Sequence, residues 1–176
     1  QHLVLHSFPT RRSSDLFVSN EKIALSRETE HNERKILELS KPESFSLYVG
    51  IPFCPSRCSY CSFVMASIER AEKLIEPYTK LLCEEIKRTA EIANKLGLRL
   101  ETVYFGGGTP TTLSAEQLDT VLRTVNNSFD MSTCREFTVE AGRPDTIDIA
   151  KLFALKENKV DRISINPQTV NDEVLK

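Results

Sequence analysis

Short apolar runs alternate with helical patterns along most of this sequence, and that alternation constrains the fold more than any other feature. The runs that predict strands are SLYVGI (46–51), TVYF (102–105), EFTVE (136–140) and DRISI (161–165). Between them, apolar residues recur at the spacing of amphipathic helices. Strands that alternate with helices form parallel sheets through right-handed crossovers. The sequence therefore predicts an α/β fold, either a doubly wound sheet or part of a (β/α) barrel.

Local signals predict where these helices begin and end. The first helix is expected to begin at Glu76 and Pro77, because proline is tolerated early in a helix. Ser114 opens the second helix with the capping-box pattern. The third helix is expected over about 146–157, with Asn158 ending it in the left-handed conformation.

Four unusual segments each follow a predicted strand. They are CPSRC (54–58), GGGTP (106–110), AGRPD (141–145) and NPQT (166–169). In parallel α/β architectures, ligands bind at the edge of the sheet where the strands have their carboxyl ends. Because all four segments converge on that edge, the sequence predicts a ligand site there.

The composition excludes several classes of function. The 176 residues are 40% hydrophobic and 27% charged, with a formal net charge of -2. This balance offers no basic surface for a nucleic-acid backbone or an anionic membrane. No apolar run approaches the ~18 residues that a membrane span needs. We therefore expect no nucleic-acid partner and no membrane span.

The cysteines point to metal chemistry. Cys54, Cys58 and Cys61 form the pattern C-x3-C-x2-C, and the chain has five cysteines in all. An odd count with three cysteines crowded together favours metal binding over disulfides, and reduced thiols favour a cytoplasmic location. Three thiolates can hold three corners of a [4Fe–4S] cluster and leave the fourth iron open for a small molecule. The pattern also fits a zinc site completed by a distant residue, or a loop of reduced thiols.

The wider sequence around the cysteines resembles a known family. The cysteine pattern, with Tyr60 before its last cysteine, resembles the signature of radical S-adenosylmethionine (SAM) proteins. Four segments, which begin at about Leu47, are similar to the oxygen-independent coproporphyrinogen III oxidase family and its HemZ-like branch. They are LYVGIPFCPSRCSYCSF (47–63), YFGGGTPT (104–111), VEAGRPDT (139–146) and RISINPQT (162–169). The resemblance implies a [4Fe–4S] cluster on the three cysteines and the N-terminal portion of a partial (β/α)6 barrel.

The same resemblance implies which residues contact SAM. They are Tyr48, Tyr60, Gly107, Gly108, Thr109, Glu140 and Gln168, the last at a position that contacts a second SAM. Several of them have an alternative role: the glycines could form a tight turn, Tyr48 could be a core residue, and Gln168 could face solvent. Glu140 ends an apolar strand, where a carboxylate needs a partner. That partner could be SAM, or an ion pair with Arg143 or Arg162.

The family resemblance also implies a reaction. SAM is cleaved by one electron from the cluster, and the resulting radical takes a hydrogen atom from a propionate of coproporphyrinogen III. Loss of carbon dioxide and an electron then leaves a vinyl group, on the way to protoporphyrinogen IX, and an external electron donor is required. Two residues depart from the family pattern: Phe63 replaces a further cysteine, and Gly50 replaces a frequent histidine. Three functions therefore stay open: a radical SAM dehydrogenase, a haem chaperone on the same scaffold, and a structural zinc module.

The sequence also suggests how the chain is divided. Residues 1–16 are interpreted as an artefactual leader, because SFPTRRSSDL (7–16) resembles a translated sequencing adapter. Residues 17–44 are polar and are expected to be a linker, and residues 45–176 to be a radical SAM core that is incomplete at its C-terminus. We expect the isolated chain to be inactive, because four strands do not complete a six-unit barrel.

Overall fold

The computed structural model describes residues 18–63 and 66–175, so the predicted leader at 1–16 lies outside the described residues. The chain divides into two compact units, Gln1–Pro42 and Glu43–Lys176. The domain boundaries that the sequence predicts, after residues 16 and 44, stay predictions. The linker role of the first unit stays a prediction.

The described part of the first unit is a helix rather than irregular chain. α2 spans Asn20–Leu37, and none of its residues is buried. The Ser19 hydroxyl caps it by accepting a hydrogen bond from the Lys22 N–H at 3.3 Å. Arg34 pairs with Glu30 one turn earlier, a contact that supports a helix without tertiary packing. The sequence lacks an apolar stripe here, so hydrophobic periodicity could not predict the helix.

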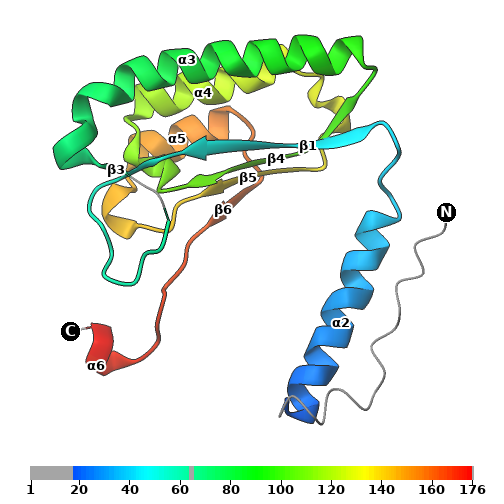
Figure 1. The fold of residues 1–176 in the computed structure, drawn as a ribbon, viewed down its shortest axis with the longest axis vertical. Coiled ribbons are helices and arrows are strands. Elements are labelled where there is room, and N and C mark those ends of the chain that lie inside the picture. The colour runs from blue at the N-terminus through cyan, green and yellow to red at the C-terminus, as the bar shows by residue number, and fades with distance from the viewer. Residues whose placement is uncertain (1–17, 64–65, 176) are drawn as a thin grey trace. The chain divides into compact units, whose positions relative to one another are not determined.

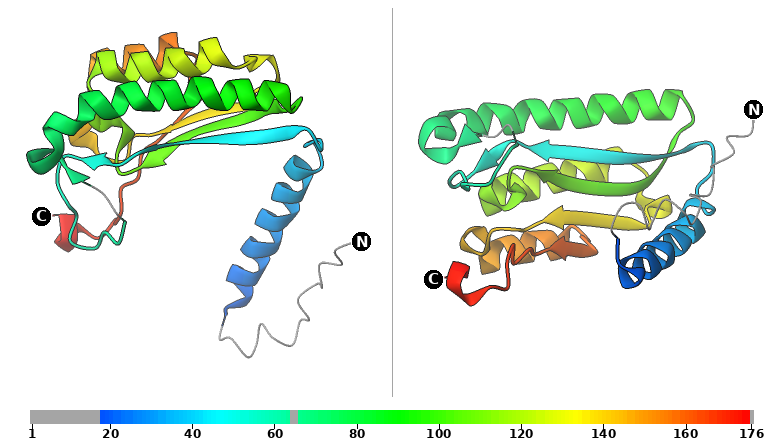
Figure 2. Two further views of the ribbon diagram at one scale, coloured as in Figure 1. Left: turned by 45° about the horizontal axis from the view of Figure 1, so that its top comes forward. Right: turned by 60° about the horizontal axis from the view of Figure 1, so that its bottom comes forward.

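The second unit is a parallel sheet with helices on one face. The sheet has four strands in the order β1-β4-β5-β6, and every neighbouring pair is parallel. These strands span Ser44–Ile51, Arg99–Gly107, Glu136–Glu140 and Arg162–Ser164. The connecting helices are α3 (Ile68–Lys95), α4 (Ala115–Ser128) and α5 (Ile149–Glu157), and all three cover the same face (Figures 1 and 2).

This arrangement decides between the two predicted architectures. Strand neighbours follow chain order and the helices share one face, as in a (β/α) barrel, whereas a doubly wound sheet carries helices on both faces. The remaining elements are short. They are β2 (Phe53–Cys54), β3 (Ala66–Ser67), α6 (Asp172–Leu175) and three 3₁₀ turns, η1 (Pro110–Thr112), η2 (Met131–Thr133) and η3 (Pro144–Thr146). None of the helices within 18–63 and 66–175 has both the length and the hydropathy to span a membrane.

The two faces of the sheet differ in chemistry because side chains alternate along each strand. Towards the helices, Phe105 and Phe137 are buried, with their ring centroids 5.6 Å apart. On the other face, the Thr102 hydroxyl donates to the Ser46 hydroxyl at 2.7 Å. The hydrophobic core therefore lies between the sheet and α3 to α5, and the opposite face is polar.

Two predicted helix ends were wrong. α3 begins at Ile68, so Pro77 lies inside the helix. Pro77 is exposed, so the carbonyl that loses its hydrogen bond to the missing proline N–H lies on the solvent side. Asn158 has φ −88°, and Lys159, with φ 58°, takes the left-handed conformation instead. Asn158 is buried, and its side-chain amide donates to Asp119 at 2.7 Å, a long-range role that a local capping signal does not reveal.

The capping box of α4 is confirmed and generates a prediction. The Ser114 hydroxyl accepts from the Gln117 N–H at 3.2 Å, and the Gln117 side chain accepts from the Ser114 N–H at 3.0 Å. We expect Ser114→Ala to lower the free energy of unfolding by about 1 kcal/mol, because one backbone N–H loses its acceptor. Chemical denaturation monitored by circular dichroism measures this change. Asn127→Ala, on the exposed surface of the same helix, is the control and should not destabilise.

Candidate functional site

The loops that follow the strands meet at one edge of the sheet, as the sequence predicts. The Gly108 N–H donates to the Ile51 carbonyl at 2.7 Å and the Thr109 N–H to the Phe53 carbonyl at 2.8 Å. Further along the edge, the hydroxyls of Thr111 and Thr146 are 2.6 Å apart. These contacts join the segments that follow β1, β4 and β5 into one rim, at the end of the sheet to which the arrowheads in Figure 1 point.

The glycines after β4 permit a very close backbone contact. Gly107 has φ 110°, which L side chains rarely adopt, and a Cβ there would lie 2.9 Å from the Ile51 carbonyl oxygen. A Cβ on Gly108 would lie 2.6 Å from the Phe53 carbonyl oxygen and 3.0 Å from the Cys54 sulfur. The glycines after β4 therefore form a tight turn, which is one of the two alternatives, and their contact with SAM stays a prediction.

The three cysteines of the motif have different surroundings. Cys54 is buried at the end of β2, and its sulfur lies 3.3 Å from the Thr109 hydroxyl. Burial raises the pKa of the Cys54 thiol, and the hydrogen bond with Thr109 opposes that rise. Cys58 and Cys61 lie half-buried in the loop between β2 and β3, where the Cys61 N–H donates to the Cys58 carbonyl at 3.1 Å. All five cysteines are free thiols.

These residues fit an iron–sulfur cluster by their chemistry. In the described part of the chain, no three His, Cys, Asp or Glu side chains are already gathered around a point that could hold a metal ion. Cys54 nevertheless lies beside the glycine backbone, and Cys58 and Cys61 lie half-buried in the loop that follows β2. Cysteine thiolates are the ligands of such clusters. The three cysteine thiols therefore suit a cluster, and the binding of a small molecule beside it stays a prediction.

A tyrosine pair connects the rim to Glu140. The rings of Tyr48 and Tyr104 are 5.9 Å apart and within 12° of parallel. The Tyr104 hydroxyl donates to a Glu140 carboxylate oxygen at 2.6 Å, and this hydrogen bond, with burial, raises the pKa of Tyr104 to about 12. Tyr48 is exposed on the polar face of β1, so its alternative role as a core residue is wrong.

Glu140 does not form either ion pair that the sequence left open. Arg143 pairs with Asp145 and Arg162 pairs with Glu136, each at 2.8 Å. The hydrogen bond from Tyr104 instead partners Glu140. Sequence reasoning missed Tyr104, because only the register of β1 against β4 shows that it lies beside Tyr48.

Two more of the predicted SAM residues are exposed. Tyr60, on the cysteine loop, is 67% exposed. Gln168 is also exposed and has a positive φ of 64°, just beyond β6. The structure thus brings Cys54 together with Gly108 and Thr109, while the SAM contacts of all seven predicted residues stay predictions.

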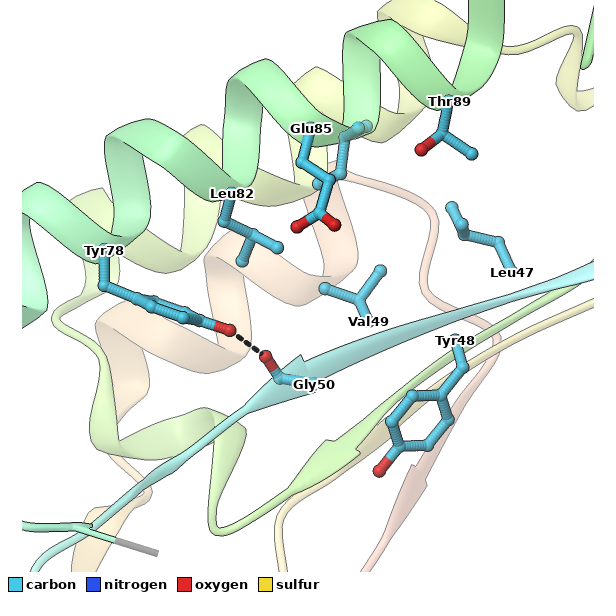
Figure 3. Close-up of a pocket in the computed structure, with 9 residues that line it drawn as sticks. Leu47, Tyr48, Val49, Gly50, Tyr78, Leu82, Glu85 and Thr89 are labelled. Carbon is cyan, nitrogen blue, oxygen red and sulfur yellow. Dashed lines mark hydrogen bonds between the residues drawn. The ribbon is translucent and has the colours of Figure 1, made fainter. Parts of the chain in front are cut away.

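A second feature near β1 lies away from the rim. A cavity of about 260 Å³ between β1 and α3 is lined by residues that include Val49, Tyr78 and Glu85. Figure 3 shows the Tyr78 hydroxyl directed at the Gly50 carbonyl, while Tyr48 points to the opposite side of the strand. The cavity therefore opens on the helix side of β1, and the tyrosine pair lies on the polar face.

Comparison with known proteins identifies the family. The sequence model of the radical SAM superfamily matches residues 48–176. The chain belongs to this superfamily. The predicted likeness to the coproporphyrinogen oxidase family is also confirmed, because the chain is 39% identical over 165 residues to the oxygen-independent coproporphyrinogen-III oxidase-like protein HemZ of Bacillus subtilis. That alignment covers 92% of this chain and 33% of the relative.

The chain is also similar to a protein named as a heme chaperone and to a solved coproporphyrinogen III oxidase structure. The chain is 40% identical over 139 residues to the heme chaperone HemW of Lactococcus lactis, an alignment that covers 78% of this chain and 34% of the relative. The solved structure of the coproporphyrinogen III oxidase HemN of Escherichia coli, described as a radical SAM enzyme, superposes with a TM-score of 0.62 at 29% identity. It covers 73% of this chain and 29% of that one. The chain thus spans about a third of the length of these relatives.

The backbone contact at Gly108 generates a prediction. We expect Gly108→Ala to lower the free energy of unfolding by about 1–3 kcal/mol, because the new methyl group must displace the Phe53 carbonyl or the Cys54 sulfur. Chemical denaturation of the metal-free protein measures this. Gly142→Ala on the same rim is the matched control, because its Cβ would meet only the Asn166 side chain at 3.7 Å. Equal stability of the two variants would contradict the close-approach interpretation.

Proposed function

We propose that this protein is a radical SAM oxidoreductase that converts coproporphyrinogen III to protoporphyrinogen IX without oxygen, in haem biosynthesis. The observation that carries the proposal is the contact of Cys54 with Gly108 and Thr109, which puts an expected cluster ligand against the glycines that are expected to bind SAM. The similarity to HemZ over 92% of the chain supports the choice of substrate. Each of the two propionates that react would lose a hydrogen atom and carbon dioxide, and would pass one electron to an external acceptor, to become a vinyl group.

The residues of the rim would divide the work of binding. Cys54, Cys58 and Cys61 would hold a [4Fe–4S] cluster, which together with SAM supplies the one-electron chemistry that removes the hydrogen atom. Gly107 and Gly108 would bring backbone carbonyls close to the amino end of the methionine part of SAM, since the Gly108 N–H already donates to the Ile51 carbonyl. The external electron donor would be a separate protein or small reductant.

The remaining predicted residues would bind SAM through their side chains. Glu140, held by Tyr104, would accept hydrogen bonds from a ribose or an ammonium group. Tyr48 and Tyr60 would give aromatic contact area, the Thr109 hydroxyl a polar contact, and Gln168 a contact with a second SAM.

A second candidate function is a haem chaperone on the same scaffold. It is favoured by the 40% identity to two HemW proteins. It is also favoured by Phe63, which replaces a further cysteine of the family pattern and is 69% exposed. A chaperone of this kind would bind haem without forming vinyl groups.

The cluster assignment predicts which cysteines matter. After anaerobic reconstitution with iron and sulfide, we expect Cys54→Ser, Cys58→Ser and Cys61→Ser each to lose the visible absorption and most of the iron. Cys134→Ser is the matched control and should retain both, because Cys134 lies before β5, outside the motif. SAM should change the electron paramagnetic resonance (EPR) spectrum of the reduced unsubstituted protein. The assignment is refuted if only the Cys134→Ser control loses iron, or if SAM leaves the EPR spectrum of the reduced protein unchanged.

Anaerobic turnover distinguishes the two candidate functions. The complete gene product, with cluster, SAM, a reductant and coproporphyrinogen III, is expected to yield vinyl products and carbon dioxide, detected by mass spectrometry. The same protein is titrated with haem, and binding is followed by the Soret band. Haem binding without vinyl products would replace the enzyme proposal with the chaperone.

A further inference from the structure

An arginine from a distant part of the chain reaches one of the motif cysteines. Arg143 lies after β5, yet its guanidinium donates towards the Cys58 sulfur at 3.6 Å. It also donates to the Ser56 hydroxyl, at 3.3 Å from one terminal nitrogen and 3.4 Å from the other. The Ser56 carbonyl lies 3.5 Å from the same guanidinium. The Arg143 side chain therefore links the cysteine loop to the third strand of the sheet.

The guanidinium is held from the other side as well. Asp145 accepts two hydrogen bonds from it, at 2.8 and 3.1 Å, which is the fork geometry of a well-oriented pair. The Arg143 backbone is fixed too, because its carbonyl accepts from the Thr146 N–H at 3.0 Å and from the Thr146 hydroxyl at 2.7 Å. Thr146 is itself buried against Thr111. The donor group is thus anchored in the folded rim, and the Arg143 side chain is only 26% exposed.

We propose that Arg143 is a positioning residue that holds Cys58 and raises the reduction potential of the cluster. The inference rests on the proposed function, in which Cys58 is a cluster ligand. Hydrogen bonds to ligand sulfurs and nearby positive charge stabilise the added electron of the reduced state. Arginine suits this task because it stays charged at all working pH values. Asp145 fixes the guanidinium in direction and offsets part of its charge.

The alternative is that Arg143 only braces the loop, and charge decides between the two. If the positive charge acts on the cluster, Arg143→Gln makes the cluster harder to reduce, and Arg143→Lys keeps most of the effect. Asp145→Asn removes a negative charge and retains an oxygen acceptor for the guanidinium, so it makes the cluster easier to reduce or leaves it unchanged. A simple brace would not give shifts whose sign follows the charge.

The test is a redox titration of the reconstituted proteins, followed by EPR. We expect Arg143→Gln to lower the reduction potential of the cluster by about 59 mV, which corresponds to a tenfold change in the equilibrium constant of a one-electron couple. Arg123→Gln is the matched control, because Arg123 pairs with Asp119 on the surface of α4, away from the cysteine loop. It should titrate like the unsubstituted protein. The inference is overturned if the reduction potential of Arg143→Gln is unchanged. It is also overturned if Asp145→Asn lowers the reduction potential by as much as the shift expected for Arg143→Gln.

Two further outcomes are distinguished in advance. If the unsubstituted protein takes up no cluster, the proposed function fails, and the effect of Arg143 on the reduction potential is overturned with it. If only the Arg143 variants fail to take up iron, hydrogen–deuterium exchange of the metal-free proteins decides the positioning role. Faster exchange over residues 55–60 in Arg143→Gln than in Arg123→Gln supports it, and equal exchange overturns it.

Discussion

The site depends on the approach of two backbones at the carboxyl ends of β1 and β4. Gly108 donates to the Ile51 carbonyl at 2.7 Å, and no side chain could stand at position 108 without meeting the Phe53 carbonyl. This contact brings Thr109 against the sulfur of Cys54. The parallel register of β1 and β4 is what aligns the two segments. The glycine loop and the cysteine motif therefore become one site through main-chain geometry rather than through side-chain pairing.

The parts of the fold that the sequence predicts are those set by hydrophobic periodicity. The alternating runs predict all four strands of the parallel sheet, and the capping box predicts the start of α4. The failures have physical causes of other kinds. α2 has no apolar stripe, Pro77 is tolerated inside α3 because it faces solvent, and Asn158 is held by Asp119 from another helix. Local signals cannot report contacts that the tertiary structure creates.

The same distinction applies to the candidate site. Position along the chain predicts that the odd segments share one edge of the sheet, because parallel strands end there together. It does not predict which side chains meet across that edge. Tyr104 is paired with Glu140 because β4 and β5 are neighbours in a particular register, and Arg143 reaches Cys58 across 85 residues of sequence. Each of these pairs a charged side chain with a group from another strand or loop.

The three motif cysteines are anchored unequally, and that inequality has a consequence for metal binding. Cys54 is buried and fixed by the backbone of β2 and the glycine loop, whereas Cys58 is held to the rest of the rim by the side chain of Arg143. When only some of the cysteine ligands are already in place, part of the free energy of metal binding is used to order the others. Contacts that hold the cysteine loop near Cys54 before the metal arrives reduce that cost. Arg143 and Asp145 thus bear on assembly of the cluster as well as on its potential, since the same hydrogen bonds position the sulfur and place a positive charge beside it.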